Sequence, residues 1–234
     1  MNAELRTLID LQALDTRISS LEAEGARLPR EIAATHAAVE EAKQAVEAAK
    51  AKLDGARKSQ RAKEKDLEDN RVKRQKFEGQ LYQVKTNKEY SAVLTEIEEV
   101  KQEQVRIEEE ILTLMELGEG LTTEGKEADA RFKARESQGR VEEVTLGEKL
   151  RGVKGDLAVV QSERAQLSGQ VASSVLADYE RLLGHLGMAI VPVIKPNSCG
   201  GCRVTITPQR LQELRQQNTL IHCESCGRYL YWTG

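Results

Sequence analysis

Large aromatic side chains are scarce in this sequence of 234 residues, which holds only 2 Phe, 5 Tyr and 1 Trp. Aromatic residues supply much of the buried area of globular cores, so their scarcity argues against a large core. Proline is also rare, with 4 residues, whereas Ala, Glu, Lys, Leu and Arg are abundant. This composition is typical of long helices and predicts a mostly α fold.

Long apolar runs are missing as well. The longest, Met188 to Ile194, is far too short to cross a bilayer. The N-terminus has no basic stretch followed by an apolar run, so nothing indicates a signal peptide. The chain carries 35 basic and 38 acidic residues, which argues against a generic polyanion binder. We therefore expect a cytoplasmic protein without membrane insertion.

Motifs of common enzyme classes do not occur. The sequence holds no phosphate-binding loop, no dinucleotide-binding fingerprint and no nucleophile elbow. It also offers no group of acidic, basic or nucleophilic residues that would form an acid–base site. We therefore expect a protein that is not an enzyme and assign no catalytic residues.

Apolar residues recur with a 3.5-residue period over most of the chain. One seam runs from Leu11 to Leu81, and 15 of its 21 positions are apolar. A second seam begins at Val93 and resumes in a shifted register between Leu146 and Val171. A sustained period of this kind predicts coiled-coil helices.

Charge predicts how these two arms pair. Residues 57–88 hold 11 basic and 5 acidic side chains, whereas residues 89–127 hold 3 basic and 12 acidic ones. Folding the chain back on itself lays opposite charges side by side, but a parallel homodimer would place like charges together. We predict an antiparallel hairpin within one chain, with its turn near 82–90. Facing residues should have numbers that sum to about 172, since the reversal is centred near residue 86.

Three local features refine this hairpin. Thr86 and Glu89 fit a capping box at the start of the second arm. Pro29 predicts a kink in the first arm. Residues 118–139 hold four glycines and few large apolar residues, so we expect a local irregularity there.

All 4 cysteines lie in the last 36 residues, as two C-x2-C pairs separated by 20 residues. The pairs are Cys199 with Cys202 and Cys223 with Cys226. Four thiolates with this spacing predict one tetrahedral Zn²⁺ per chain, although iron of the rubredoxin type would accept the same ligands. A thioredoxin-like redox pair fits less well, because no βαβ pattern surrounds the cysteines. Four protein ligands leave no open position for a substrate, so the metal should be structural.

The sequence thus divides into a hairpin at 1–180, a linker at 181–198 and a zinc ribbon at 199–234. Within the ribbon region we expect strands at 203–206, 220–222 and 228–232. A short helix at 209–216 should follow Thr207 as N-cap and Pro208 as first helical residue.

Two groups of residues are candidates for binding a partner. Lys85, Lys88 and Tyr90 lie at the turn and would suit recognition, although Tyr82 and Tyr90 packing over Val84 would explain the aromatics locally. The second group, near the C-terminus, would form a stacking platform for single-stranded nucleic acid or simply the core of the ribbon. Its members are Arg228, Tyr229, Tyr231 and Trp232.

These features together resemble, over the whole chain, a family of bacterial proteins long catalogued as a domain of unknown function. The resemblance rests on the turn 81–90, on the segment Tyr179 to Leu182 and on the four cysteines. It implies a coiled-coil hairpin with a four-cysteine zinc ribbon and an adaptor or chaperone-like role. Some members are linked to the alternative nitrogen sigma factor, to flagellar or type III secretion regulation, and to RNA binding.

We therefore expect a non-enzymatic regulator that binds a protein partner through the hairpin and the ribbon. By the resemblance, that partner would be a sigma factor or a secretion or flagellar component. The alternative is a regulator that binds RNA or DNA through the zinc ribbon.

Overall fold

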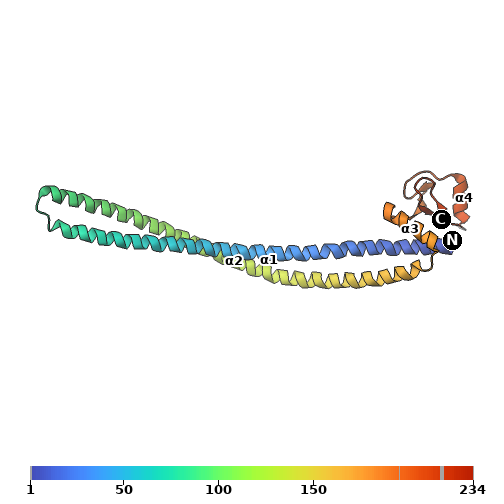
Figure 1. Ribbon diagram of the computed structural model, residues 1–234, viewed down its shortest axis with the longest axis horizontal. Helices are drawn as coiled ribbons and strands as arrows, with labels where there is room; N and C mark the ends of the chain where they lie inside the picture. The colour runs from blue at the N-terminus through green and yellow to red at the C-terminus, as the bar shows by residue number, and fades with distance from the viewer. Residues whose placement is uncertain (1, 195, 217–218, 234) are drawn as a thin grey trace. The chain divides into compact units, whose positions relative to one another are not determined.

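The computed structural model describes residues 2–194, 196–216 and 219–233. Its helices are α1 (Ala3–Leu81), α2 (Asn87–Ser168), α3 (Ser173–Leu186) and α4 (Pro208–Gln216), shown in Figure 1. The strands are short and lie near the C-terminus, which confirms the mostly α fold with a small β-rich ribbon. Among the described residues, no helix has a stretch long and apolar enough to cross a membrane.

The chain forms two compact units. The first, here called the base unit, combines residues 1–32 with residues 144–234. The second, the tip unit, consists of residues 33–143. In each unit the segments of α1 and α2 run side by side in opposite directions (Figure 1), which confirms the antiparallel hairpin.

Ion pairs between the arms of the tip unit join basic side chains of α1 to acidic side chains of α2, as the charge pattern predicts. The pairs are Lys52–Glu124 at 3.2 Å, Lys63–Glu110 at 2.6 Å and Arg71–Glu108 at 3.8 Å. The numbers of these partners sum to between 173 and 179, slightly above the predicted 172. The seam itself is narrow, with Val46 and Ala49 packed against Ala128.

The expected irregularity at 118–139 is wrong, because α2 is continuous through all four glycines. Gly139 has a packing role: a Cβ atom there would lie 2.9 Å from Cγ2 of Val39 on α1. The glycine therefore lets the two helices approach closely. Helix α1 is likewise continuous through Pro29, and a bend at that residue remains a prediction.

The turn between the arms is closed by the predicted capping box. The amide of Thr86 donates to Glu89 Oε2 at 3.2 Å, and the amide of Glu89 donates to Thr86 Oγ1 at 3.3 Å. These bonds to Thr86 hold the pKa of the Glu89 carboxyl below its usual range. The turn thus satisfies the first amides of α2 without help from the aromatic residues nearby.

The base unit has a core that joins the helices to the ribbon. Leu5, Leu8 and Leu11 of α1 are at most 2% exposed. They belong to one apolar cluster with residues of the α2–α3 connection, α3 and the strands, namely Val171, Tyr179, Leu182, Ala189, Ile190 and Tyr229. The predicted seam began only at Leu11, so the sequence analysis missed the first two of these leucines.

The ribbon contains a four-stranded sheet of order β2-β1-β4-β3. Its strands are β1 (Ile190–Ile194), β2 (Ser198–Cys199), β3 (Ile221–His222) and β4 (Tyr229–Tyr231). Strand β1 pairs in parallel with β4, whereas β1–β2 and β3–β4 are antiparallel. The expected linker at 181–198 contains the end of α3 and all of β1.

The predicted strands at 220–222 and 228–232 are present as β3 and β4, and Pro208 begins helix α4 as expected. The strand expected at 203–206 is wrong. Arg203 has a φ of 63°, a left-handed conformation that a strand does not accommodate. Only Thr205 in this segment makes a bridge, to Ser198.

Candidate metal centre

The four cysteines converge at one point of the ribbon. Their Sγ atoms all lie within 4.8 Å of one another, and the four residues form the one such metal-ligating group found among the described residues. Sγ of Cys199 is 3.8 Å from that of Cys226, and Sγ of Cys202 is 3.6 Å from that of Cys223. Tetrahedral zinc with Zn–S bonds of about 2.3 Å places sulfur atoms about 3.8 Å apart. The donor set therefore fits one Zn²⁺, held by four thiolates.

Two similar knuckles position these thiols. In each, the residue after the second cysteine has a left-handed backbone: Arg203, with a φ of 63°, and Gly227, with a φ of 73°. The amide of Arg203 donates to the carbonyl of Cys199 at 2.9 Å, and the amide of Gly227 donates to that of Cys223 at 2.8 Å. Each knuckle is thus closed by one backbone hydrogen bond from the residue that turns the chain.

Glycine in the first knuckle is required by space. A Cβ atom on Gly200 would lie 2.6 Å from the carbonyl oxygen of Pro192, to which the Gly200 amide donates at 2.9 Å. The amide of Gly201 donates to Sγ of Cys199 at 3.4 Å. The glycines thus bring backbone amides close to a sulfur atom and to β1.

The cysteine thiols do not share one pKa, because their surroundings differ. The backbone N–H of Val204 lowers the pKa of Cys202 to about 6. Burial raises the pKa of Cys199, and it raises that of Cys223 to about 12. Since zinc binds thiolates, metal binding must displace protons from the buried pair.

His222 lies beside the centre but does not belong to it. Its Nδ1 atom is 2.9 Å from the carbonyl oxygen of Gly227, so that nitrogen is the donor. The imidazole ring packs against the ring of Tyr229, with centroids 4.1 Å apart. The four cysteines complete the shell, as the sequence analysis expects.

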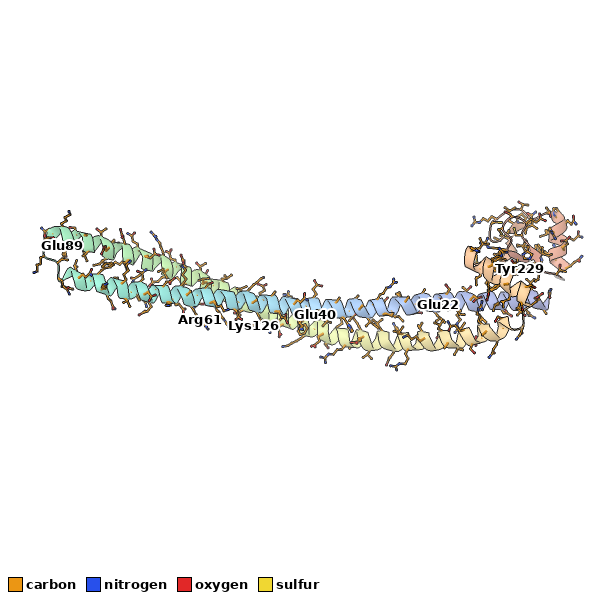
Figure 2. All side chains as sticks on the ribbon, viewed as in Figure 1. Glu22, Glu40, Arg61, Glu89, Lys126 and Tyr229 are labelled. Atoms are coloured by element: carbon orange, nitrogen blue, oxygen red, sulfur yellow. The ribbon has the colours of Figure 1, made fainter. Side chains whose placement is uncertain are left out.

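The candidate residues near the C-terminus have structural contacts. Tyr229, labelled in Figure 2, is 2% exposed and belongs to the core of the base unit. Nε and Nη2 of Arg228 donate to the carbonyl oxygens of Met188 and Leu186. The ring of Trp232 lies under the guanidinium of Arg215, 5.0 Å from its centroid. Of this group, Tyr229 is buried, whereas Arg228, Tyr231 and Trp232 are partly exposed. Since Arg228 is bonded to backbone carbonyls, the group does not favour a stacking platform.

The candidate residues at the turn are exposed. Lys85, Lys88 and Tyr90 surround the capping box, whose Glu89 is labelled in Figure 2. Tyr82 is 90% exposed and Tyr90 is 46% exposed, so Tyr82 does not cover Val84 as the local explanation requires. The turn and the cysteine centre belong to different units.

The polar contacts that attach the ribbon to α1 were not predicted from the sequence. The Gln12 side chain accepts from the amides of Ala189 and Ile190 at 2.7 and 2.8 Å, and it donates to the carbonyl of Ile190 at 2.8 Å. Nearby, Asp15 accepts from Arg164 Nε and from the hydroxyl of Tyr179, both at 2.8 Å. Arg164 occupies a position of the seam that is usually apolar. A charged residue at such a position indicates a polar contact in place of apolar packing.

A long antiparallel helical hairpin that ends in a four-cysteine knuckle pair defines a coiled-coil zinc-ribbon protein. Comparison with family models agrees, since residues 198–230 match the C4-type zinc ribbon domain. Residues 11–187 match the CT398-like coiled coil hairpin domain. The chain belongs to this CT398-like family.

Solved structures share the fold over nearly the whole chain. CT398 from Chlamydia trachomatis has 24% identity and a TM-score of 0.85, with 98% of each chain covered. HP0958 from Helicobacter pylori has 20% identity and a TM-score of 0.63, covering 100% of this chain and 98% of that one. A protein from Mycobacterium smegmatis has 17% identity and a TM-score of 0.73, with 99% and 98% covered. No curated protein matches the sequence significantly.

Proposed function

We propose that the protein is a non-enzymatic adaptor that binds a protein partner through the turn of its hairpin, with the zinc ribbon as a second contact region. One observation carries this proposal: Tyr82 is 90% exposed at a turn that has its own capping box. An aromatic ring left in water loses the burial energy that would otherwise stabilise the fold. Exposed aromatic residues beside cations are typical anchors of protein interfaces.

The surroundings of Tyr82 support a partner with an acidic face. Lys85 and Lys88 are exposed, and their side chains form no ion pair within the described part of the chain. Beside them lies a cleft of about 420 Å³ whose lining includes Val84 and Val93. Aromatic, apolar and cationic groups thus share one small surface, here called the turn surface. The resemblance to sigma-factor, flagellar and secretion regulators supports a regulatory partner of one of those kinds.

Nucleic-acid binding by the ribbon has less support. Its platform would need Tyr229 and Arg228, but the first is buried and the second donates to backbone carbonyls. Contacts to phosphate would depend on free cations, and Arg210 is paired with Glu213 and Glu224. A protein partner therefore remains the better proposal.

The test combines affinity capture with substitutions that spare the cap. Tagged full-length protein would be compared with a variant carrying Tyr82→Ala, Lys85→Ala, Lys88→Ala and Tyr90→Ala, each with and without nuclease. We expect the variant to lose the main captured protein while its helix content and melting temperature stay unchanged. Capture should survive nuclease, since the proposed partner is a protein.

A charge-matched control separates loss of the turn surface from loss of positive charge in general. Lys65→Ala with Lys126→Ala removes two exposed lysines of the tip unit that lie outside the turn surface. This control should capture the partner normally. If it loses the partner as fully as the turn variant, or if nuclease abolishes all capture, the proposal is wrong.

A further inference from the structure

Several large apolar side chains of α2 stay exposed in the tip unit although the seam lies on the same helix, and four of them lie near one line. Leu94, Val105, Leu112 and Met115 are 43%, 54%, 60% and 45% exposed. Their spacings of 11, 7 and 3 residues correspond to about three, two and one helical turns. They therefore follow one line along α2, whereas the seam residues Ile97, Val100 and Ile107 are at most 6% exposed.

Each of these apolar residues is followed four positions later by a glutamate. The pairs are Leu94 with Glu98, Val105 with Glu109, Leu112 with Glu116 and Met115 with Glu119. Residues four apart are neighbours on a helix surface, so every glutamate lies on the same line as its apolar residue. The side chains of these four glutamates form no ion pair with any described residue.

Other acidic residues of α2 are used inside the hairpin. Nearby acidic residues of the same helix, Glu108, Glu110 and Glu124, all pair with cations of α1. The second arm thus contains acidic residues that pair with α1 and others, including these four glutamates beside exposed apolar groups, that form no ion pair among the described residues. The line formed by the four apolar residues and their four glutamates is here called the outer stripe.

We propose that the outer stripe binds an amphipathic helix with basic flanks, supplied by a partner protein. Leu94 to Met115 spans about 32 Å of helix, at about 1.5 Å per residue, which a partner helix of about 20 residues would cover. Apolar residues at 3- and 4-residue spacing present the pattern that a helix recognises. Four unpaired carboxylates select lysine or arginine on that helix and repel acidic ones.

A second copy of this chain does not offer the matching surface. Its α2 would bring acidic residues against the acidic stripe. Its α1 is basic over residues 57–81, but Val72 is the one large apolar side chain of α1 that is exposed, among the described residues. A foreign helix is therefore the favoured occupant. This surface is separate from the turn surface, and the proposal does not depend on it.

The experiment measures binding of synthetic helical peptides to the full-length protein by fluorescence anisotropy. The probe is a peptide of 21 residues with leucine at alternating 3- and 4-residue spacing and lysine at the flanking positions. One comparison peptide has glutamate at the flanks, and another has the same composition as the probe in scrambled order. We expect only the ordered lysine peptide to bind, with an affinity that falls as salt rises.

Two substitutions test the site, and one provides a matched control. Val105→Gln with Leu112→Gln removes apolar groups from the outer stripe while keeping good helix formers, and it should weaken binding about tenfold or more. Leu117→Gln is the control, because Leu117 is 50% exposed but lies about 140° round the helix from Leu112. Glu109→Gln with Glu116→Gln should reduce both the affinity and its salt dependence. All variants should melt like the parent protein.

Several outcomes overturn the proposal. Equal binding of the ordered and scrambled lysine peptides would mean attraction to charge alone. Equal weakening by Leu117→Gln would mean that the outer stripe has no special role. If light scattering shows a dimer that Val105→Gln with Leu112→Gln dissociates, the occupant is a second copy and not a foreign helix.

Discussion

Glycine at position 200 is required because of its neighbours, and not because of an unusual backbone angle. A Cβ atom there would collide with the carbonyl oxygen of Pro192 at 2.6 Å, inside the first knuckle. By contrast, nothing lies within 4 Å of a Cβ atom placed on Gly184 in the last turn of α3. The same residue type therefore has opposite effects on stability at two positions of the base unit.

We predict that Gly200→Ala weakens zinc retention and lowers the stability of the base unit, because the first knuckle must move away from β1. Gly184→Ala should raise stability by about 0.5–1 kcal/mol, since alanine is the better helix former. Chemical denaturation and competition with a zinc-binding dye measure the two effects. Equal behaviour of the two variants would contradict the packing argument.

Tyr179 joins three helices through its hydroxyl. It is fully buried and donates to Asp15 at 2.8 Å, while Arg164 donates to the same carboxylate and to Glu180. Burial, followed by the bond to Asp15, raises the pKa of this phenol above its usual value near 10. The buried phenol is therefore neutral over a wider pH range than a tyrosine in the unfolded chain.

This difference predicts an alkaline loss of stability. Above about pH 10 the unfolded chain releases the Tyr179 proton but the folded chain retains it, so stability falls as pH rises further. Tyr179→Phe should lower stability at neutral pH by about 0.5–1.5 kcal/mol, the usual net value of one hydrogen bond, and should flatten the alkaline slope. Urea titrations at pH 7 and above pH 10 measure both. Tyr82→Phe is the control and should change neither.

At the scale of elements, the seam of the tip unit contains a polar layer. Gln104 of α2 is 7% exposed and accepts from Arg74 Nη1 at 3.2 Å. Its Nε2 atom is buried and has no hydrogen-bond partner. A buried amide left half satisfied weakens a coiled coil, although such a residue can also fix the register of the helices.

Replacing this residue should therefore stabilise the tip unit. We predict that Gln104→Leu raises its free energy of unfolding by about 1 kcal/mol, because the unsatisfied N–H group is removed. Arg74 keeps its pair with Glu78 at 2.9 Å. Thermal melting provides the measurement, and Gln102→Leu on the exposed face is the matched control. A lower melting temperature in Gln104→Leu would mean that the bond to Arg74 outweighs the unpaired amide.

The elements themselves follow closely from sequence because their signals are local. Heptads and the capping box at Thr86 depend on residues within a few turns of one another, and the opposed charges of the arms are visible as two continuous segments of the sequence. The continuous helix at 118–139 was not predictable from glycine content, since the helical hydrogen-bond ladder and packing such as Gly139 on Val39 override propensity. The strand expected at 203–206 is absent because Arg203 has a left-handed backbone conformation. The sequence contains no signal for that conformation.

The candidate sites were predictable to different degrees. The four ligands of the cysteine centre were predictable, because two C-x2-C pairs are the usual ligand set of a tetrahedral zinc site. A core role for Tyr229 was one of the two predicted alternatives, but its packing with α1 residues such as Leu8, more than 200 positions away in the sequence, was not predictable. Gln12 likewise carries no local signal for its bonds to Ala189 and Ile190.

For the whole molecule, the shared core of the base unit determines which segments lose structure when the metal is removed. We predict that Cys202→Ser, or removal of zinc by a chelator, unfolds the ribbon and also loosens residues 3–11 and α3, because these pack on Ile190 and Tyr229. The helices of the tip unit should remain, so most of the helical circular dichroism signal is retained. Hydrogen exchange measured by segment checks both statements. Full protection of residues 3–11 in the metal-free protein would show that the ribbon is independent of α1.

The division of the chain into units has a consequence for synthesis. Residues 33–143 are continuous, so every residue of the tip unit has been made before the base unit is complete, but Leu5, Leu8 and Leu11 find their partners only after residues near 190 and 229 have been made. Until then these leucines have nothing to cover them. Residues 3–11 are therefore made long before the strands that bury them. A chain released before β4 is made displays these apolar side chains, which quality-control chaperones recognise.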